Sequence, residues 1–271
     1  MRRKAAMCLL VVVALTGLSQ SAFGRAFEVR LMKGTEKDGV WGTDEFQVSV
    51  SSLGTVRHVI VKGKELVWQA AALYTSPVPA GAKEGVRTVQ GEGIGDRGLT
   101  VMPPTMETRD DHGHRIFTFR HLVANKKVLD GKPLCRADQQ IIITPTGGIS
   151  VSYDFEWLET IAWHGFSLLI LFQKEALAGR DFTLIFGNRL LTGRLTPGKP
   201  IAESRIREAF DRLSIGSEVG PFHHVWDVPS TCEFSPPQLT IQPKTVVYRG
   251  VIYKGLKDRI SYRILLPVLQ Q

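Results

Sequence analysis

Two short segments place an aromatic ring next to a histidine, a pairing that can hold a sugar. In residues 163–165 (WHG), Trp163 could stack on a sugar ring while His164 bonds its hydroxyls. In residues 222–227 (FHHVWD), an extended strand places His224 and Trp226 on one face and Asp227 on the other. The alternative for the first segment is a core tryptophan with a histidine bonded to the backbone. For the second segment, the alternative is an edge strand with one wet face.

A third segment, residues 110–114 (DDHGH), gathers carboxylates and imidazoles that could hold a metal ion. A solvated hairpin tip explains the same residues, because Asp and Gly are favoured in turns. The glycine-rich residues 91–95 (GEGIG) lack the strand-to-helix setting of a phosphate loop, and the sequence has no G-x-S-x-G elbow. We therefore predict no metal and no cofactor.

Strands must position these side chains, because alternation of apolar and polar residues dominates the chain. Residues 149–157 (ISVSYDFEW) alternate throughout, which is typical of a strand with one buried face. Further strands are expected over residues 46–50, 56–61, 115–123, 140–143, 239–242, 245–253 and 260–266, and over the nearly continuous apolar runs 166–172 and 182–186. About a dozen short strands at this spacing predict packed antiparallel sheets.

Other segments indicate turns, one helix and one long loop. Residues 111–114 and 146–148 have the composition of hairpin turns. A helix is expected around Ile206, Ala209, Phe210 and Leu213, which share one helical face, with Ser204 as its cap and Gly216 at its end. Residues 76–98 are rich in Gly and Pro and predict a long loop of the kind that often binds ligands. No linker or repeat is visible, so residues 25–271 are expected to form a single domain.

Residues 1–24 have the features of a secretory signal peptide. They begin with basic residues, continue with the apolar run 7–15 (MCLLVVVAL) and end with small residues before an expected cleavage site after Gly24. The run is shorter than the about 20 residues that span a bilayer; the alternative is a retained anchor. Cleavage removes three of 34 basic residues and none of 26 acidic ones, so the net charge falls from +8 to +5. We expect a secreted or periplasmic chain without a membrane span, and no nucleic-acid partner, because no Lys/Arg block is present.

Two cysteines, Cys135 and Cys232, remain after the predicted cleavage. In an oxidising compartment, two cysteines could form one disulfide. The alternative is two separate buried thiols. The sequence leaves both open, because the bond requires Cα atoms within about 7 Å of each other.

Residues 45–69 (EFQVSVSSLGTVRHVIVKGKELVWQ) resemble the opening of galactose mutarotase-like proteins, with the family's G-x-E-L step at Gly63 to Leu66. Residues 234–243 (FSPPQLTIQP), which lead into 245–249, are similar to the family's closing pair of strands, and residues 149–157 fit its central sheets. The resemblance implies an all-β, antiparallel β-supersandwich, here with one short helix, that handles carbohydrate.

The family's usual catalytic residues do not carry over. Its N-H-x-aromatic motif is absent, since Asn125 is followed by Lys126 and Asn188 by Arg189. An epimerase of this family needs a base for the anomeric hydroxyl and an acid for the ring oxygen, usually a carboxylate and a histidine. The candidate catalytic residues are therefore His164 and His224, with Asp227 or Glu233 as the base that the family places in its last third.

Three functions are consistent with these observations. The first is an exported carbohydrate-binding β-sandwich without turnover, the second a sugar-acting enzyme (epimerase-like or lyase-like) with a His/carboxylate pair, and the third an envelope interaction module without a sugar. A fold alone does not decide among them. For a mono- or polysaccharide ligand, we expect one open cleft that gathers partly exposed residues from Trp163, His164, His224, Trp226 and Asp227. The competing outcome places Trp163 and Trp226 in the core.

Overall fold

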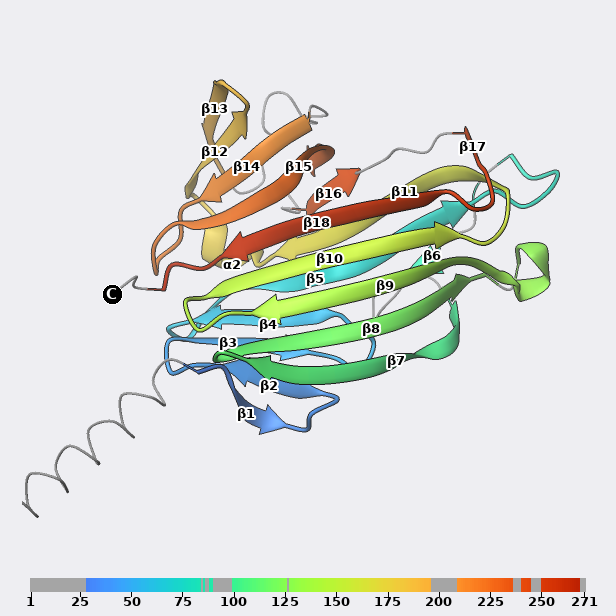
Figure 1. Cartoon of the computed structure of the whole chain (residues 1–271). Helices are drawn as coiled ribbons and strands as arrows, with labels where there is room; N and C mark the ends of the chain where they lie inside the picture. Colours follow the sequence, from blue (N-terminus) through green and yellow to red (C-terminus); the bar gives the residue numbers. More distant parts are fainter. Residues whose placement is uncertain are drawn as a thin grey trace, which may run out of the picture.

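Antiparallel strands form nearly all the regular structure in the computed structural model, which describes residues 28–83, 85, 88–89, 99–125, 127–195, 209–235, 240–244 and 250–268. The predicted leader, residues 1–24, lies outside the described residues. The strands form two layers, and Figure 1 shows one layer in front of the other. Among the described residues, no helix is long and apolar enough to cross a membrane.

The first layer, which we call the front sheet, has the strand order β13–β12–β14–β15–β18–β10–β9–β8–β7, with every pair antiparallel. Its strands are β7 (Leu99–Asp111), β8 (His114–Ala124), β9 (Pro133–Ile143), β10 (Gly148–Trp157), β12 (Asp181–Phe186), β13 (Arg189–Arg194), β14 (Ala209–Ile215), β15 (Phe222–Ser235) and β18 (Lys257–Leu265).

The second layer, the back sheet, has the order β1–β2–β3–β4–β5–β11, with β6 paired to β5 and with β16 and β17 paired to β11. Its strands are β1 (Arg30–Gly34), β2 (Gly39–Gly42), β3 (Phe46–Val50), β4 (Val56–Val61), β5 (Lys64–Pro77), β6 (Thr88–Val89), β11 (Ile161–Phe172), β16 (Thr240–Lys244) and β17 (Gly250–Ile252).

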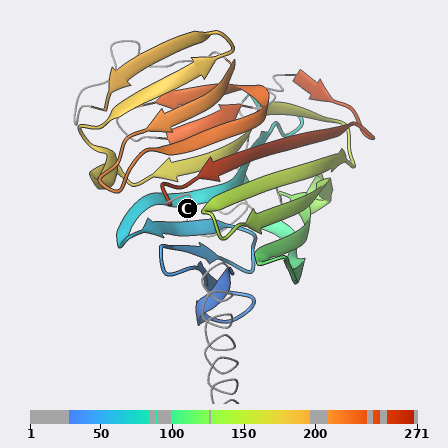
Figure 2. The same cartoon turned by 60° about the vertical axis from the view of Figure 1, so that its left-hand side comes forward.

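Strand β15 connects the two layers. Its first half pairs with β18 of the front sheet, and its second half pairs with β16 of the back sheet. Figure 2 shows the orange strands β14 to β16 between the yellow hairpin β12–β13 and the red strand β18. The long strand therefore carries side chains of the sequence-predicted site into two different sheets.

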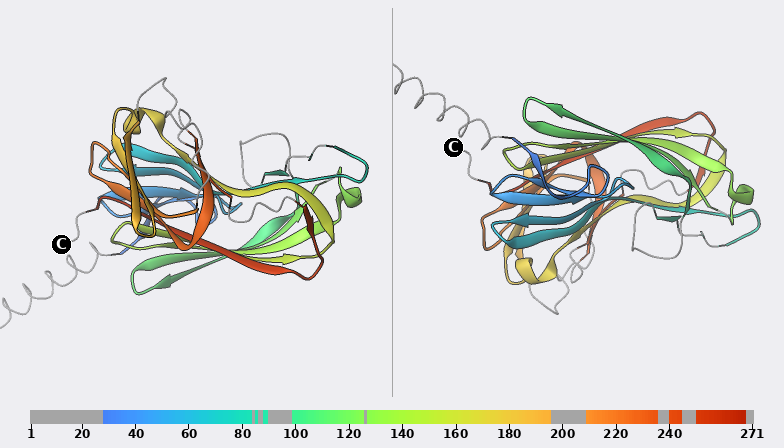
Figure 3. Two further views of the ribbon diagram at one scale, coloured as in Figure 1. Left: turned by 90° about the horizontal axis from the view of Figure 1, so that it is seen from above. Right: turned by 90° about the horizontal axis from the view of Figure 1, so that it is seen from below.

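The two sheets pack against each other around an apolar core, and Figure 3 shows the layers edge on. Two buried tyrosines of the front sheet bind one residue of β5: Tyr153 Oη donates to the Ala71 carbonyl at 2.6 Å, and the Ala71 N–H donates to Tyr262 Oη at 3.0 Å. Ala71 has a left-handed φ of 59° and no partner residue in β4 or β11. The tyrosines thus satisfy backbone groups that a β-bulge removes from the ladder.

Most of the predicted strands and both predicted turns are confirmed. Residues 46–50, 56–61 and 149–157 form β3, β4 and most of β10, and residues 115–123, 140–143, 166–172 and 182–186 lie within β8, β9, β11 and β12. At the first hairpin, Asp111 pairs with His114, and His112 and Gly113 have φ of 49° and 80°. Two consecutive positive φ values are the signature of a type I′ turn. Of residues 245–253, the part 245–249 lies outside the described residues.

The predicted helix around Phe210 and Leu213 is wrong, because residues 209–215 form strand β14 between β12 and β15. Phe210, Leu213 and Ile215 are all buried. The pairing with β15 shifts register between Phe210 and Arg212, with the additional residues on β15. The buried residues Phe210 and Leu213 are therefore three positions apart instead of two, which imitates a helical stripe.

The helix that the described residues do contain is the single turn α2 (Lys174–Leu177), which follows β11; a 3-10 turn, η1 (Leu129–Gly131), lies between β8 and β9. The predicted long loop over residues 76–98 is shorter than expected at its start, because Ser76 and Pro77 still belong to β5. Most of its second half lies outside the described residues, apart from β6.

Candidate functional site

The front sheet is polar on the face that points away from the core. Along β10, the apolar residues at odd positions from Ile149 to Trp157 are buried, and the residues between them point outward. The same alternation continues in β9 and β18, which flank β10. Outward-pointing side chains of three neighbouring strands therefore share one surface.

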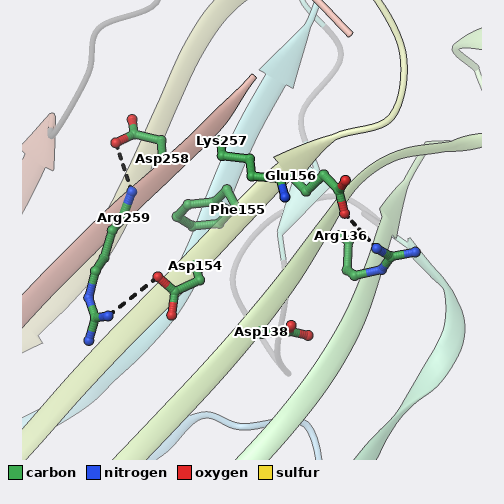
Figure 4. A pocket seen from close by; sticks show the side chains of 8 residues that line it. All are labelled: Arg136, Asp138, Asp154, Phe155, Glu156, Lys257, Asp258 and Arg259. Carbon is green, nitrogen blue, oxygen red and sulfur yellow. Dashed lines mark hydrogen bonds and ion pairs between the residues drawn. The ribbon is translucent and has the colours of Figure 1, made fainter. Parts of the chain in front are cut away.

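This surface contains a pocket of about 500 Å³, which we call the charged pocket (Figure 4). It is lined by Arg136 and Asp138 of β9, Asp154, Phe155 and Glu156 of β10, and Lys257, Asp258 and Arg259 of β18. Seven of these eight side chains carry a charge, so the pocket suits a ligand rich in hydrogen-bonding groups rather than an apolar one.

Strand register arranges the outward charges in two rows. The first row contains Arg136, Glu156 and Lys257, and the second contains Asp138, Asp154 and Arg259. Ion pairs connect neighbours within each row: Arg136 Nη1 lies 2.5 Å from Glu156 Oε2, and Arg259 Nη1 lies 3.6 Å from Asp154 Oδ1. These pairs hold four of the six side chains in place.

The other two side chains of these rows, Asp138 and Lys257, have no hydrogen bond or ion pair within the described part of the chain. Both side chains are exposed. Asp138 lies directly opposite Asp154, and like charges at such positions repel each other. Asp138 is therefore available to accept hydrogen bonds from a ligand, and Lys257 is available to donate them.

An exposed aromatic side chain lies close by. Tyr253, which is 70% exposed, stands in the turn between β17 and β18, four residues before Lys257. Two hydrogen bonds fix this turn to the end of β10: the Gly255 N–H donates to the Trp157 carbonyl at 2.7 Å, and the Trp157 N–H donates to the Leu256 carbonyl at 2.9 Å. The exposed residues Tyr253 and Leu256 therefore lie in a turn that is fixed to the end of β10 next to Glu156 of the charged pocket.

His224 and Trp226 share one face of β15, as predicted, but that face is turned to the core. Their side chains are 0% and 4% exposed, and both rings pack against Tyr262, with centroids 4.9 and 5.2 Å away. Burial lowers the pKa of His224 from 6.5 to about 3, so its ring is neutral near pH 7. The expectation of an open cleft therefore fails for these two side chains.

The remaining residues of the predicted site do not join this pair. Asp227 points to the outer face of the front sheet, where its Oδ1 lies 3.3 Å from Arg263 Nε. Trp163 and His164 belong to β11, and Glu233 belongs to the half of β15 that pairs with β16. The side chains of these three residues lie outside the described residues, so their roles stay predictions.

Neither the cysteines nor the third segment forms a site in the described structure. Cys135 is a buried free thiol, and burial raises its pKa. This corresponds to the alternative of separate thiols, and the Cys232 side chain lies outside the described residues. At the hairpin, Asp110 Oδ1 accepts a hydrogen bond from Arg115 Nη1 at 2.9 Å. Among the described residues, no three His, Cys, Asp or Glu side chains are placed to hold a metal ion.

A histidine–carboxylate pair that the sequence reasoning missed lies on the hairpin β4–β5. His58 Nδ1 lies 2.9 Å from Glu65 Oε1, and because a carboxylate only accepts, the Nδ1–H donates. Glu65 Oε2 accepts a second bond from Gln173 Nε2 at 3.0 Å. His58 also has a left-handed φ of 49°, which is uncommon for a residue other than glycine. Glu65 is thus held at both oxygens, and it orients the imidazole.

The hairpin turn at Gly63 was visible in the sequence, and it pairs Ile60 with Glu65. A register shift between Val59 and Ile60 then moves His58 within reach of Glu65. That bulge was not predictable from the strand pattern. The pair stands beside a second pocket of about 240 Å³, whose lining includes Glu65 and Gln173.

No protein-family model matches the sequence, and no curated protein matches it. Among solved structures, galactose 1-epimerase from Lactobacillus acidophilus NCFM gives a TM-score of 0.53 at 8% identity, over 88% of this chain and 98% of that one. A galactose mutarotase-like protein from Clostridium acetobutylicum gives 0.51 at 7% identity, over 89% and 98%. The GalM/aldose epimerase homologue from C. elegans gives 0.50 at 10% identity, over 82% and 96%. The chain therefore has the galactose mutarotase-like fold that the sequence resemblance implied.

Proposed function

We propose that this chain binds carbohydrate in the charged pocket of β9, β10 and β18. The observation that carries the proposal is the combination of Asp138 and Lys257, both without partners among the described residues, with the exposed ring of Tyr253. A sugar presents hydroxyls that donate to a carboxylate and accept from an ammonium group, and its apolar ring face stacks on an aromatic side chain.

The fold supports a sugar rather than another polar ligand, since the similar structure from Lactobacillus acidophilus is named as a galactose 1-epimerase. The fold does not transfer the reaction, because one fold supports several functions. The proposal is therefore binding on the outer face of the front sheet, by a chain that is exported to the periplasm or the medium.

The proposal is tested on a glycan array with the mature chain and with Tyr253→Ala. We expect the wild-type chain to bind a set of related glycans. Loss of the aromatic surface should weaken that binding by about 1–3 kcal/mol without a change in melting temperature. Leu190→Ala serves as the control, because Leu190 is an exposed apolar residue of β13. Equal binding by Tyr253→Ala and wild type would remove Tyr253 from the site.

A second candidate function is that of a sugar-acting enzyme, and the His58–Glu65 pair favours it. With Nδ1 donating to Glu65, the Nε2 atom of His58 carries the lone pair, and such an imidazole can take a proton from an anomeric hydroxyl. NMR exchange between sugar anomers tests this function. Wild type should accelerate the exchange, His58→Asn should abolish the acceleration, and His112→Asn, at an exposed turn, should keep it. Exchange at the uncatalysed rate with wild type excludes this candidate.

A further inference from the structure

Two of the three cations that line the charged pocket form ion pairs with its carboxylates. Arg136 faces Glu156 at 2.5 Å, and Arg259 faces Asp154 at 3.6 Å. Lys257, the third cation of the lining, has no such partner within the described part of the chain. Its ammonium group is exposed and retains its charge for a ligand.

A second cation in the same condition lies on β8, the strand next to the pocket's edge at β9. Arg120 on β8 is exposed and stands opposite Asp138 in the register, yet no ion pair joins it to another described residue. In the register, Arg120 lies in the row of Asp138, Asp154 and Arg259, and Lys257 lies two residues further along β18. Three strand spacings of about 4.8 Å and this offset separate Arg120 from Lys257 by roughly 16 Å, which exceeds one sugar unit. Asp138 is the neighbour of Arg120 on β9.

We infer that the ligand is an acidic glycan whose units carry carboxylates, a uronate oligosaccharide. The inference rests on the proposed function, since it names the class of sugar for the same pocket. Lys257 and Arg120 bind the carboxylates of successive units, and the planar guanidinium of Arg120 suits a carboxylate in particular. Asp138 accepts hydrogen bonds from ring hydroxyls, and Tyr253 supports the apolar face of the unit nearest to Lys257. A neutral glycan would use the hydroxyl contacts and form no ion pair with either cation.

The test is titration calorimetry of the mature chain at low ionic strength with pairs of oligosaccharides. Galacturonate, mannuronate and glucuronate-containing oligomers are each compared with their own methyl esters, which keep the stereochemistry and remove the charge. In at least one pair, the acid should bind about tenfold more tightly than its ester. One charge-assisted hydrogen bond contributes a difference of this size. Added salt should reduce that difference.

Variants assign the effect to the pocket. Lys257→Gln should reduce the advantage of the acid over its ester, because only Arg120 then pairs with a carboxylate, and should leave ester binding unchanged. Lys254→Gln is the matched control, because Lys254 is an exposed lysine of the turn that precedes β18, and it should change neither affinity. An equal loss with Lys254→Gln would mean diffuse attraction and would overturn the inference.

The remaining outcomes separate the inference from the proposed function. Equal affinities of acid and ester in every pair overturn the acidic class and leave carbohydrate binding standing. If only a sulfated oligomer binds, the ligand is a sulfated glycan and not a uronate, and the inference is also overturned. If neither the acids, the esters nor any glycan of the array binds, the proposed function itself fails.

Discussion

His121 and His224 are buried in the core, and burial lowers their pKa from 6.5 to about 4 and about 3, respectively. For His121, a hydrogen bond that its Nε2–H donates to Gln139 Oε1 opposes the shift. In the unfolded chain both rings gain a proton near pH 6.5. Between pH 6.5 and 4 the unfolded state therefore binds more protons than the folded state. The free energy of unfolding should fall by roughly 1.4 kcal/mol per pH unit for each ring as the pH decreases through this window.

Chemical denaturation between pH 7 and pH 4 measures this slope. His224→Phe should keep the aromatic packing and remove two buried nitrogens that have no partner among the described residues. The free energy of unfolding should then depend less steeply on pH, because one ring fewer takes up a proton on unfolding. His112→Asn should leave the slope as in wild type, because the His112 side chain is 97% exposed. A slope that is the same in His224→Phe and wild type would mean that His224 is not buried.

Trp226 is a core residue rather than a binding platform. Its ring lies against His224 and Tyr262, at 4.8 and 5.2 Å between centroids. Trp226→Ala should therefore lower the free energy of unfolding by about 3–5 kcal/mol and leave the sugar affinity of the folded molecules unchanged. Melting and binding curves of this one variant check both parts. If Trp226→Ala melts as wild type but loses sugar affinity, Trp226 is part of the binding site.

The sequence predicted which side chains share a face of β15, but not which face is buried. The strand period places His224 with Trp226 and apart from Asp227, and the structure confirms this. Apolar and polar residues occur on both faces, so the period alone does not orient the strand. The charged pocket was even harder to predict from the sequence. Whether Asp138 and Lys257 are available to a ligand depends on their neighbours in β10, which only the strand register reveals.

At the scale of elements, the bulge of β5 at Ala71 joins the two sheets. Tyr153→Phe removes the donor to the buried Ala71 carbonyl and should lower the free energy of unfolding by about 1–3 kcal/mol. Tyr253→Phe is the matched control, since its hydroxyl is on an exposed ring, and it should melt as wild type. Equal stability of the two variants would show that the Tyr153 hydroxyl does not support the bulge.

Bulges also explain where strand prediction failed. The regular alternation of residues 149–157 identified β10 correctly, because its pairing with β9 and β18 has no register shift. β14 was mistaken for a helix because the shift between Phe210 and Arg212 disturbs the period. The same kind of shift in β4 hid the contact between His58 and Glu65. A bulge depends on the partner strand, which a single segment of sequence does not contain.

At the scale of the whole molecule, the proposed export makes a prediction about the N-terminus. Protein recovered from the periplasm or the medium should begin at Arg25, because residues 22–24 (AFG) provide a cleavage site for the leader. Mass spectrometry of the intact protein measures the first residue. Recovery of a chain that still begins at Met1 would exclude this processing.

The most direct test of the proposed function is the sugar affinity of Asp138→Asn, measured by titration calorimetry with a glycan that the wild-type chain binds. In our proposal Asp138 accepts hydrogen bonds from the ligand. An asparagine at this position has the same size but only one acceptor oxygen. Asp130→Asn serves as the control, because Asp130 is exposed in η1, outside the pocket, and asparagine tolerates its φ of 53°. We predict a loss of about 1.5–3 kcal/mol of binding free energy for Asp138→Asn and none for Asp130→Asn, with equal melting temperatures. Unchanged affinity in Asp138→Asn would contradict the placement of the sugar in the charged pocket.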